Sequence, residues 1–374
     1  MMQLLDSELS QLTTGLTGRL KEVLLDIVEN VEISSDFCIR HPDYKPLDLP
    51  AEVVARFDNL PKEMRDKYLS LQLRSFLYGI YYNGSMQRSQ ALDSEATGWQ
   101  LDLENNTFLG VEMEFYLRLH ESNRGEGYFD AGWSVLREET DGSLAVTKGG
   151  LRLHIQREKH LQKSQQSAVV GDVVSIRMPE NLVQNGFYMA VGNAGIQGNL
   201  NSEDNAATVR IYFNVTPEGA VAVMRGLTEK LNEMEIPFSF KVLYNPADYD
   251  RYDSGVLYFE KDNYESVWQV LSSVYQEHQS HFQPELPLFT MELAPGLGLA
   301  EEPDRKFASQ ESFGMNRCQI IANGLLTAWQ QGDNSPEGRM RAILSQFSLL
   351  GIDWQRPYLN AESRDVYREL ELAG

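Results

Sequence analysis

The sequence predicts an α+β protein in which a mixed β-sheet packs against helices and follows a mainly helical N-terminal region. Residues 208–259 alternate clearly between strand, helix, strand, turn and strand. Residues 1–98 instead carry apolar side chains at helical spacing in two separate runs. With 42% hydrophobic residues among 374, the chain can also fill a sizeable core.

The strands of residues 208–259 are marked by period-two alternation. Apolar and polar side chains alternate over residues 209–215, with Arg210 and Tyr212 on the polar face. The same alternation over residues 238–244 places Lys241 on a polar face. Both strands are therefore expected to bury only one face.

A helix joins these two strands. Thr216 supplies an N-cap hydroxyl, Pro217 suits the first helical position, and Pro237 ends the helix. Two strands joined in this way are expected to lie parallel, with a right-handed crossover, if they share a sheet. Arg210 and Lys241 would then lie on one face of that sheet.

The chain is expected to contain three parts. Residues 1–98 form the helical N-terminal region, which ends at a polar stretch near Gly98. Residues 99–352 form the α+β domain. Residues 353–374 form a C-terminal tail, which is expected to be a short helix on the surface.

Further elements are expected within the α+β domain. Residues 106–121 are predicted to be helical, and residues 144–156 to form a strand after a hairpin turn at Asp141 and Gly142. Residues 294–314 are interrupted by proline and glycine and predict an extended loop. Loops of that length are often functional.

The balance of charges excludes several classes of protein. The 33 Lys and Arg residues and 54 Asp and Glu residues give a net charge of −21, which argues against nucleic-acid binding because phosphate affinity comes from basic side chains. The two cysteines, Cys38 and Cys318, indicate a reducing compartment and buried thiols. The sequence has no apolar run of transmembrane length and no secretory signal, so a cytoplasmic protein without membrane contact is expected.

Standard catalytic and cofactor motifs are absent from the sequence. It contains no P-loop, no nucleophile elbow and no zinc motif. His278 and His281 have HxxH spacing at the end of a predicted helix, which favours a surface helix terminus over a metal site.

Cations and hydrogen-bonding groups on polar strand faces are the candidates for a functional site. In this acidic chain they comprise Arg152, His154, Arg210, Tyr212, Lys241 and, in a turn, Arg251. Guanidinium groups match phosphate with paired donors, and a lysine crowded by cations has a lowered pKa and can act as a base. The alternative for each residue is an ordinary solvent-exposed strand face.

Three long runs resemble a known family. They are RIYFNVTPEGA, IPFSFKVLYNPADYDRYDSGVLYF and LAPGLGLAEEPDRKFASQESFGMNRCQIIANGL, within residues 125–326. These runs are similar to the HopA-type effector family, which includes a type III secreted effector of a plant pathogen, many cyanobacterial and actinobacterial proteins, and the lyase component of class V lanthipeptide synthetases.

The resemblance implies a metal-independent phosphoserine or phosphothreonine lyase, which removes phosphate by β-elimination and leaves a dehydroamino acid in a ribosomally made peptide. Motif matching implies that Lys241 takes the Cα proton and that His154, in RLHI, is the acid. The matching further implies a set of phosphate and substrate contacts, namely Arg152, Arg210, Arg251, Arg317, Tyr212 and Tyr258. The implied partners are a phosphorylated peptide, a kinase and a cyclase, with no cofactor.

Two other interpretations remain open. The same basic residues suit a non-catalytic module that binds a phosphorylated peptide or a protein. The chain is alternatively a scaffold, in which cations pair with the abundant carboxylates, as Arg251 would with Asp248, Asp250 or Asp253.

Overall fold

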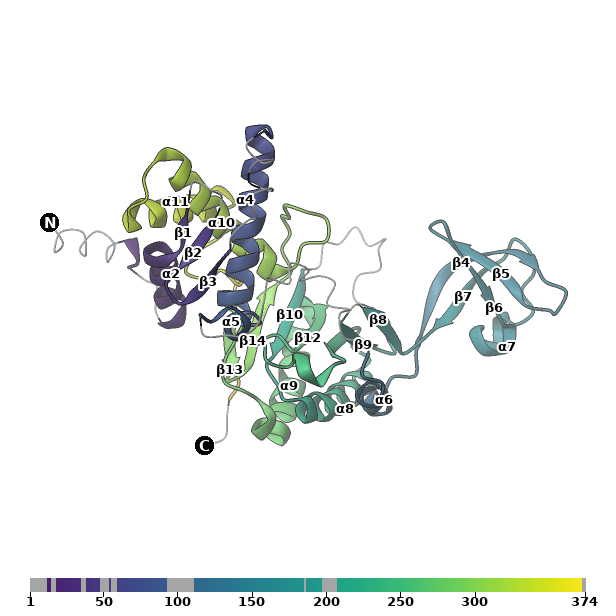
Figure 1. Cartoon of the computed structure of the whole chain (residues 1–374). Helices are drawn as coiled ribbons and strands as arrows, with labels where there is room; N and C mark the ends of the chain where they lie inside the picture. Colours follow the sequence, from purple (N-terminus) through teal and green to yellow (C-terminus); the bar gives the residue numbers. More distant parts are fainter. Residues whose placement is uncertain are drawn as a thin grey trace.

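The computed structural model describes residues 12–14, 18–34, 38–47, 54, 59–92, 111–184, 186–196 and 207–371. Within these residues the strands form three sheets, and all strand pairs are antiparallel (Figure 1). The α+β class is thereby confirmed. The expected boundary near Gly98 lies outside the described residues.

A seven-stranded sheet forms the centre of the molecule. In spatial order its strands are β13 (Met291–Ala294), β14 (Leu297–Glu301), β10 (Thr208–Phe213), β12 (Gly255–Glu260), β11 (Ser239–Leu243), β9 (Phe187–Val191) and β8 (Asn181–Gln184). β10 and β11 both run antiparallel to β12, which lies between them, so they are parallel to each other as expected. The prediction of a mixed sheet is nevertheless wrong, because β12 separates the two parallel strands.

Helices cover one face of this sheet (Figure 1). They are α6 (Met113–Ser122), α8 (Pro217–Glu233) and α9 (Tyr264–His278). The N-cap of α8 is Thr216, whose side chain accepts a hydrogen bond from the Gly219 amide, as the sequence predicts. Single turns of 3-10 helix occur at η2 (Lys163–Gln165), η3 (Pro246–Asp248), η4 (Lys261–Asn263) and η5 (Gln279–His281).

The N-terminal region is mixed rather than mainly helical. Its elements are α2 (Gly18–Asn30), β1 (Glu32–Ile33), β2 (Ile39–His41), β3 (Tyr44–Leu47), α4 (Lys62–Leu77), the π-helix η1 (Tyr78–Tyr82) and α5 (Gln87–Gln90). The prediction of a mainly helical region is wrong between residues 32 and 47, where the described residues form three short strands. Pro46 lies in the terminal strand of a three-stranded sheet, where its missing N–H is tolerated.

A second core joins this region to the two long helices α10 (Phe313–Gln331) and α11 (Pro336–Leu349). Tyr212, Val256 and Ala300, from the other face of the central sheet, also belong to it. The second face of the sheet is therefore covered at one end. Among the helices of the described residues, none is long and apolar enough to cross a membrane.

Close packing of α10 on α11 leads to a prediction for Gly324. A Cβ atom at this position would lie 2.6 Å from the Cα atom of Ile343. Alanine normally stabilises a helix interior by about 1 kcal/mol over glycine, but overpacking costs about 1–3 kcal/mol. We therefore expect Gly324→Ala to lower the free energy of unfolding in denaturant titrations, whereas Gln331→Ala, on the exposed end of α10, should change it by less than about 0.5 kcal/mol. A more stable Gly324→Ala protein would contradict this packing.

A four-stranded sheet stands apart from the rest of the molecule (Figure 1). In spatial order it contains β6 (Leu151–Ile155), β5 (Leu144–Lys148), β4 (Tyr128–Glu138) and β7 (Val173–Met178), followed in sequence after β6 by α7 (Arg157–His160). The Asp141-Gly142 hairpin turn is confirmed between β4 and β5. Residues 144–156 form two strands rather than one, because Gly149 and Gly150 adopt positive φ angles and reverse the chain.

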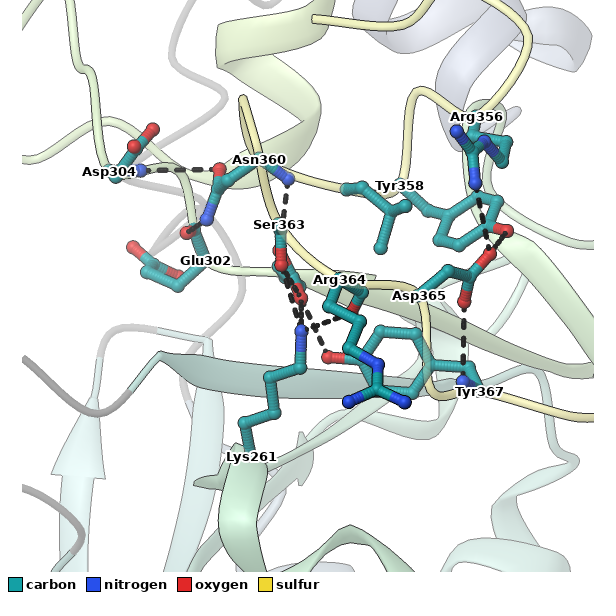
Figure 2. Close-up of polar contacts among 12 residues, drawn as sticks. Lys261, Glu302, Asp304, Arg356, Tyr358, Asn360, Ser363, Arg364, Asp365 and Tyr367 are labelled. Atoms are coloured by element: carbon teal, nitrogen blue, oxygen red, sulfur yellow. Dashed lines mark hydrogen bonds and ion pairs between the residues drawn. The ribbon is translucent and has the colours of Figure 1, made fainter.

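The C-terminal segment, residues 353–371, contains no helix, and the predicted surface helix is therefore wrong. Leu359, Tyr367 and Leu370 are buried in the core beneath the central sheet. The predicted loop of residues 294–314 is also wrong in part, since β13 and β14 form a hairpin there. Figure 2 shows polar side chains of the C-terminal segment gathered around Lys261.

Candidate functional site

The eight residues predicted for the site lie in four places. Arg210, Tyr212, Lys241 and Tyr258 belong to the central sheet. The remaining four are Arg152 and His154 on β6, Arg251 before β12, and Arg317 in α10.

Strand register places the first group on one face of the central sheet. Arg210 on β10 is paired with Tyr258 on β12, and Tyr258 is paired with Ser239 on β11. Directly opposed residues point to the same side of a sheet, and so do residues two apart in a strand. Tyr212 and Lys241 therefore share the face of Tyr258, and the expectation that Arg210 and Lys241 lie on one face is confirmed.

The Tyr258 ring contacts both cations. The Arg210 guanidinium carbon lies 5.0 Å from the ring centroid, and Lys241 Nζ lies 5.5 Å from it. Lys241 Nζ is also 4.5 Å from the centroid of Phe187 and donates a 3.2 Å hydrogen bond to Gln184 Oε1. Lys241 has no carboxylate partner among the described residues, and it is partly exposed. This group of Arg210, Tyr212, Lys241 and Tyr258 is called the sheet-face cluster below.

Arg210 is a permanently charged member of the cluster. The residue is 9% exposed and pairs with Glu302, which also accepts a hydrogen bond from Lys306. Burial on its own would lower the pKa of the guanidinium, but Tyr258, Tyr212 and Glu302 together raise it well above its ordinary value. Arg210 and Lys306 thus share the carboxylate of Glu302, whereas the described contacts of Lys241 are to Gln184, Phe187 and Tyr258.

Tyr212 contributes a buried phenol. Its Oη atom has no hydrogen-bond partner among the described residues, although the residue is only 2% exposed. Burial raises the pKa of Tyr212 to about 12, despite the opposing effect of Arg210. A neutral hydroxyl beside a guanidinium is a hydrogen-bond donor suited to an anionic oxygen.

Arg251 is occupied by an internal ion pair. Its Nε and Nη2 atoms donate to the two oxygens of Asp253 at 2.6 and 2.8 Å, and both side chains are largely buried. Burial would lower the pKa of Arg251, but the pair with Asp253 raises it. Asp250 pairs instead with Arg88. Arg251 is therefore held by its ion pair with Asp253, and none of its described contacts is with a member of the sheet-face cluster.

Arg317 holds the C-terminal segment. The side chain is 1% exposed and donates from Nε to the Pro357 carbonyl at 2.7 Å and from Nη2 to the Leu359 carbonyl at 3.0 Å. Its Nη1 atom donates to Asn316 Oδ1 at 2.6 Å. All three nitrogens thus have internal acceptors. Sequence reasoning had no means of finding this role, since the acceptors lie about 40 residues further along the chain.

Arg152 and His154 do not share a sheet with Lys241. They lie on β6 of the four-stranded sheet, where His154 Nδ1 is 3.5 Å from Glu139 Oε1 and its side chain is 64% exposed. The alternation in residues 151–155 correctly identifies a strand with a polar face. The alternation does not indicate which sheet the strand joins. The structure places His154 in the four-stranded sheet and Lys241 in the central sheet, so the two residues do not converge as expected.

Some members of the site were missed from the sequence. Glu302, Gln184 and Phe187 contact the predicted cations directly. The four-residue spacing of Glu302 and Lys306 was a detectable sign of a paired carboxylate. Within the described parts of the chain, no three His, Cys, Asp or Glu side chains are grouped so as to hold a metal ion.

Comparisons with known proteins agree with the resemblance. Residues 178–359 match the HopA1 effector protein family. An effector protein from Pseudomonas syringae pv. tomato strain DC3000 is 18% identical, with a TM-score of 0.40, covering 67% of this chain and 81% of its own. An effector protein from Pseudomonas syringae pv. syringae strain 61 is 14% identical, with the same TM-score and coverage. No curated protein matches the chain in sequence.

Proposed function

Since residues 178–359 are a HopA1 effector protein family domain, we propose that this chain is an effector-like module that binds a phosphorylated peptide at its sheet-face cluster. The observation that supports the proposal is the contact of one ring, Tyr258, with both Arg210 and Lys241 on a single sheet face. The partner is a phosphoserine or phosphothreonine side chain.

The chemistry of the cluster suits a phosphate monoester. Lys241 supplies an ammonium group whose described hydrogen bond goes to a neutral amide, so a phosphate oxygen meets no competing carboxylate there. The Tyr212 phenol lies beside Arg210 but is only 2% exposed and packs against Tyr82 and Phe313, so it supports the cluster from within the core. Arg210 is shared with Glu302, and a bound phosphate would compete with that carboxylate. Lys241 is therefore the residue on which affinity should depend most.

Phosphate elimination at the same cluster is a second candidate. Neutral Lys241 would take the Cα proton, the electron pair of that C–H bond would form the Cα–Cβ double bond, and the Cβ–O bond would break with its electrons leaving on phosphate. Arg210 would stabilise the departing charge, and the Tyr258 phenol is a closer proton donor than His154, which belongs to another sheet. The presence of a basic and a phenolic group on one face favours this candidate.

One experiment separates the two candidates. A phosphothreonine peptide and its unphosphorylated counterpart are incubated with the full chain, with affinity followed by fluorescence anisotropy and peptide mass by mass spectrometry. We expect preferential binding of the phosphopeptide. Loss of the mass of phosphoric acid would establish elimination, whereas binding with an unchanged mass would establish a non-catalytic module.

Substitutions at Lys241 test the cluster itself. Lys241→Ala should weaken phosphopeptide binding by roughly tenfold or more, because it removes the most accessible cation. Lys241→Arg should retain binding but lose any elimination, since a guanidinium stays protonated and cannot act as a base. Lys67→Ala, an exposed change on α4, is the matched control. Equal affinity for both peptides, or no effect of Lys241→Ala, would contradict the proposed site.

A further inference from the structure

The four-stranded sheet differs in charge from the rest of the chain. Residues 127–178 contain seven Lys and Arg residues and six Asp and Glu residues, whereas the remaining residues contain 26 and 48. An acidic partner is therefore repelled by most of the protein but not by this sheet. The sheet also stands away from the acidic bulk (Figure 1).

One face of this sheet carries Arg137, Arg152 and His154, whereas Lys148 lies on the other face and pairs with Asp130. The opposite face holds a small core that includes Trp133, Val146 and Ile176. Strand pairing groups two cross-strand rows on the open face: Val173, Ser134, Thr147 and Arg152 in one, and Arg137, Ala145 and His154 in the other. Among the described residues, none makes a hydrogen bond or ion pair with the exposed Arg152 guanidinium.

Strand β6 is the edge of the sheet beside these cations. It pairs only with β5, so its outer backbone edge has no strand partner among the described residues. Arg152 and His154 point to the open face, and Leu151 and Leu153 point to the other. Leu151 is 55% exposed, so the edge also presents apolar surface. An unpaired strand edge of this kind can accept an extended peptide through main-chain hydrogen bonds.

We propose that β6 receives an extended segment of a partner protein in which acidic and apolar side chains alternate. The segment adds as a fifth strand, with its acidic side chains beside Arg152 and His154 and its apolar ones beside Leu151 and Leu153. Period-two alternation on the partner is required because neighbouring strands present matching faces. This surface lies on a different sheet from the sheet-face cluster and requires no phosphate.

The pattern of charges favours an acidic peptide over a nucleic acid. Glu139 lies among the cations, 2.7 Å from Arg137 Nε and 3.5 Å from His154 Nδ1. A phosphate backbone would meet this carboxylate and has no apolar side chains for Leu151. A peptide strand places an acidic side chain beside Arg152, which has no carboxylate partner among the described residues, and apolar side chains beside Leu151 and Leu153.

The test uses the full chain and an unphosphorylated, fluorescently labelled peptide of alternating glutamate and valine. A peptide of alternating lysine and valine is the comparison. We expect anisotropy to show binding of the glutamate peptide alone. Hydrogen exchange should show new protection at residues 151–155, because their outer amides would become hydrogen-bonded. Arg152→Glu should weaken binding roughly tenfold or more and allow the lysine peptide to bind.

Lys159→Glu is the matched control, since it makes the same change of charge on α7 instead of the sheet. It should leave the affinity within about twofold of the unmodified protein. The proposal would be overturned if both peptides bound equally, or if the Arg152→Glu protein bound the glutamate peptide as before. It would also be overturned if hydrogen exchange showed protection at β8 or β13 instead of β6, or if the chain bound phosphatidylserine vesicles and neither peptide. The Arg152→Glu protein should bind the phosphopeptide with unchanged affinity. A failure of the proposed β6 site can therefore be distinguished from a failure of the proposed phosphate site at Lys241.

Discussion

Replacing Glu301 by alanine should lower the free energy of unfolding by about 3–5 kcal/mol, measured by denaturant titration. Glu301 is fully buried at the end of β14, and its Oε1 atom accepts hydrogen bonds from Lys261 at 2.7 Å, Ser363 at 2.7 Å and Tyr367 at 2.8 Å. Its Oε2 atom accepts from the Asn360 amide at 2.9 Å. Removal of the carboxylate takes the acceptor away from the Tyr367 hydroxyl and the Asn360 amide. It also leaves the Lys261 charge unpaired, although Lys261 Nζ keeps its hydrogen bonds to Ser363 and the Arg364 carbonyl (Figure 2).

Two further variants test whether the loss of stability comes from the Glu301 carboxylate. Glu369→Ala, an exposed change in the same C-terminal segment, should alter stability by less than about 0.5 kcal/mol. The double variant Glu301→Gln with Lys261→Met should recover much of the loss, because it removes both charges together. A Glu301→Ala protein as stable as Glu369→Ala would contradict the assignment of Glu301 as the anchor of the segment.

The Glu301 contribution should also depend on pH. Burial would raise the pKa of Glu301, but the bonds from the Asn360 amide, Lys261, Ser363 and Tyr367 outweigh this effect and lower it. The folded pKa therefore lies below the unfolded one, so the contribution is complete above the ordinary carboxyl pKa. It is lost as pH falls through the folded value. The stability difference between the unmodified protein and Glu301→Gln should accordingly shrink as the solution is acidified below about pH 4.

Replacing Arg317 by alanine should lower the free energy of unfolding by about 3 kcal/mol or more. The change orphans the buried carbonyls of Pro357 and Leu359, each at about 1–3 kcal/mol, and leaves a cavity that adds a few kcal/mol. An opposing effect exists, because burial lowers the pKa of Arg317 from 12.5 to about 10. That shift means that removing the buried charge stabilises the folded state by roughly 3 kcal/mol. This gain is smaller than the combined cost of the two orphaned carbonyls and the cavity.

The same variant decides between two roles for Arg317. If it clamps the C-terminal segment, Arg317→Ala should lose stability and speed proteolysis of residues 353–371, yet bind the phosphopeptide normally below its unfolding temperature. Arg317→Lys should show an intermediate loss, because one ammonium cannot reach both carbonyls in the same geometry. Unchanged stability together with reduced phosphopeptide affinity would instead support the phosphate contact implied by the family resemblance.

Both expected losses concern the C-terminal segment, which the sequence misrepresents as a surface helix. The Arg317 and Glu301 contacts reach it from α10 and β14. Lys261 adds a 2.7 Å hydrogen bond to the Arg364 carbonyl. Since this segment has no regular secondary structure, its backbone groups require such partners, and the two buried charges supply them.

The sequence predicted an element correctly where that element is specified by residues within its own segment, such as strand alternation and helix caps. Alternation over residues 209–215, the Thr216 cap and the Pro217 start all correspond to β10 and α8 as the structure has them. The side to which Arg210, Tyr212 and Lys241 point was also predictable, because side-chain direction in a strand follows from position alone. The expectation that β10 buries only one face was wrong, because residues 209–213 are all buried. Residues 32–47 were not predictable in this way, since their short strands depend on pairing with one another.

The sequence by itself determined that Arg210 and Tyr212 alternate with apolar residues in one strand and Lys241 in another, that the chain is acidic, and that the strands and long helices of residues 208–278 form. Only the tertiary structure decided which cations meet. It set Lys241 beside Tyr258, placed His154 in a separate sheet, and closed Arg251 and Arg317 onto internal acceptors. The physical reason is that side-chain direction is a property of one strand, whereas strand order and buried ion pairing depend on contacts between residues far apart in the chain.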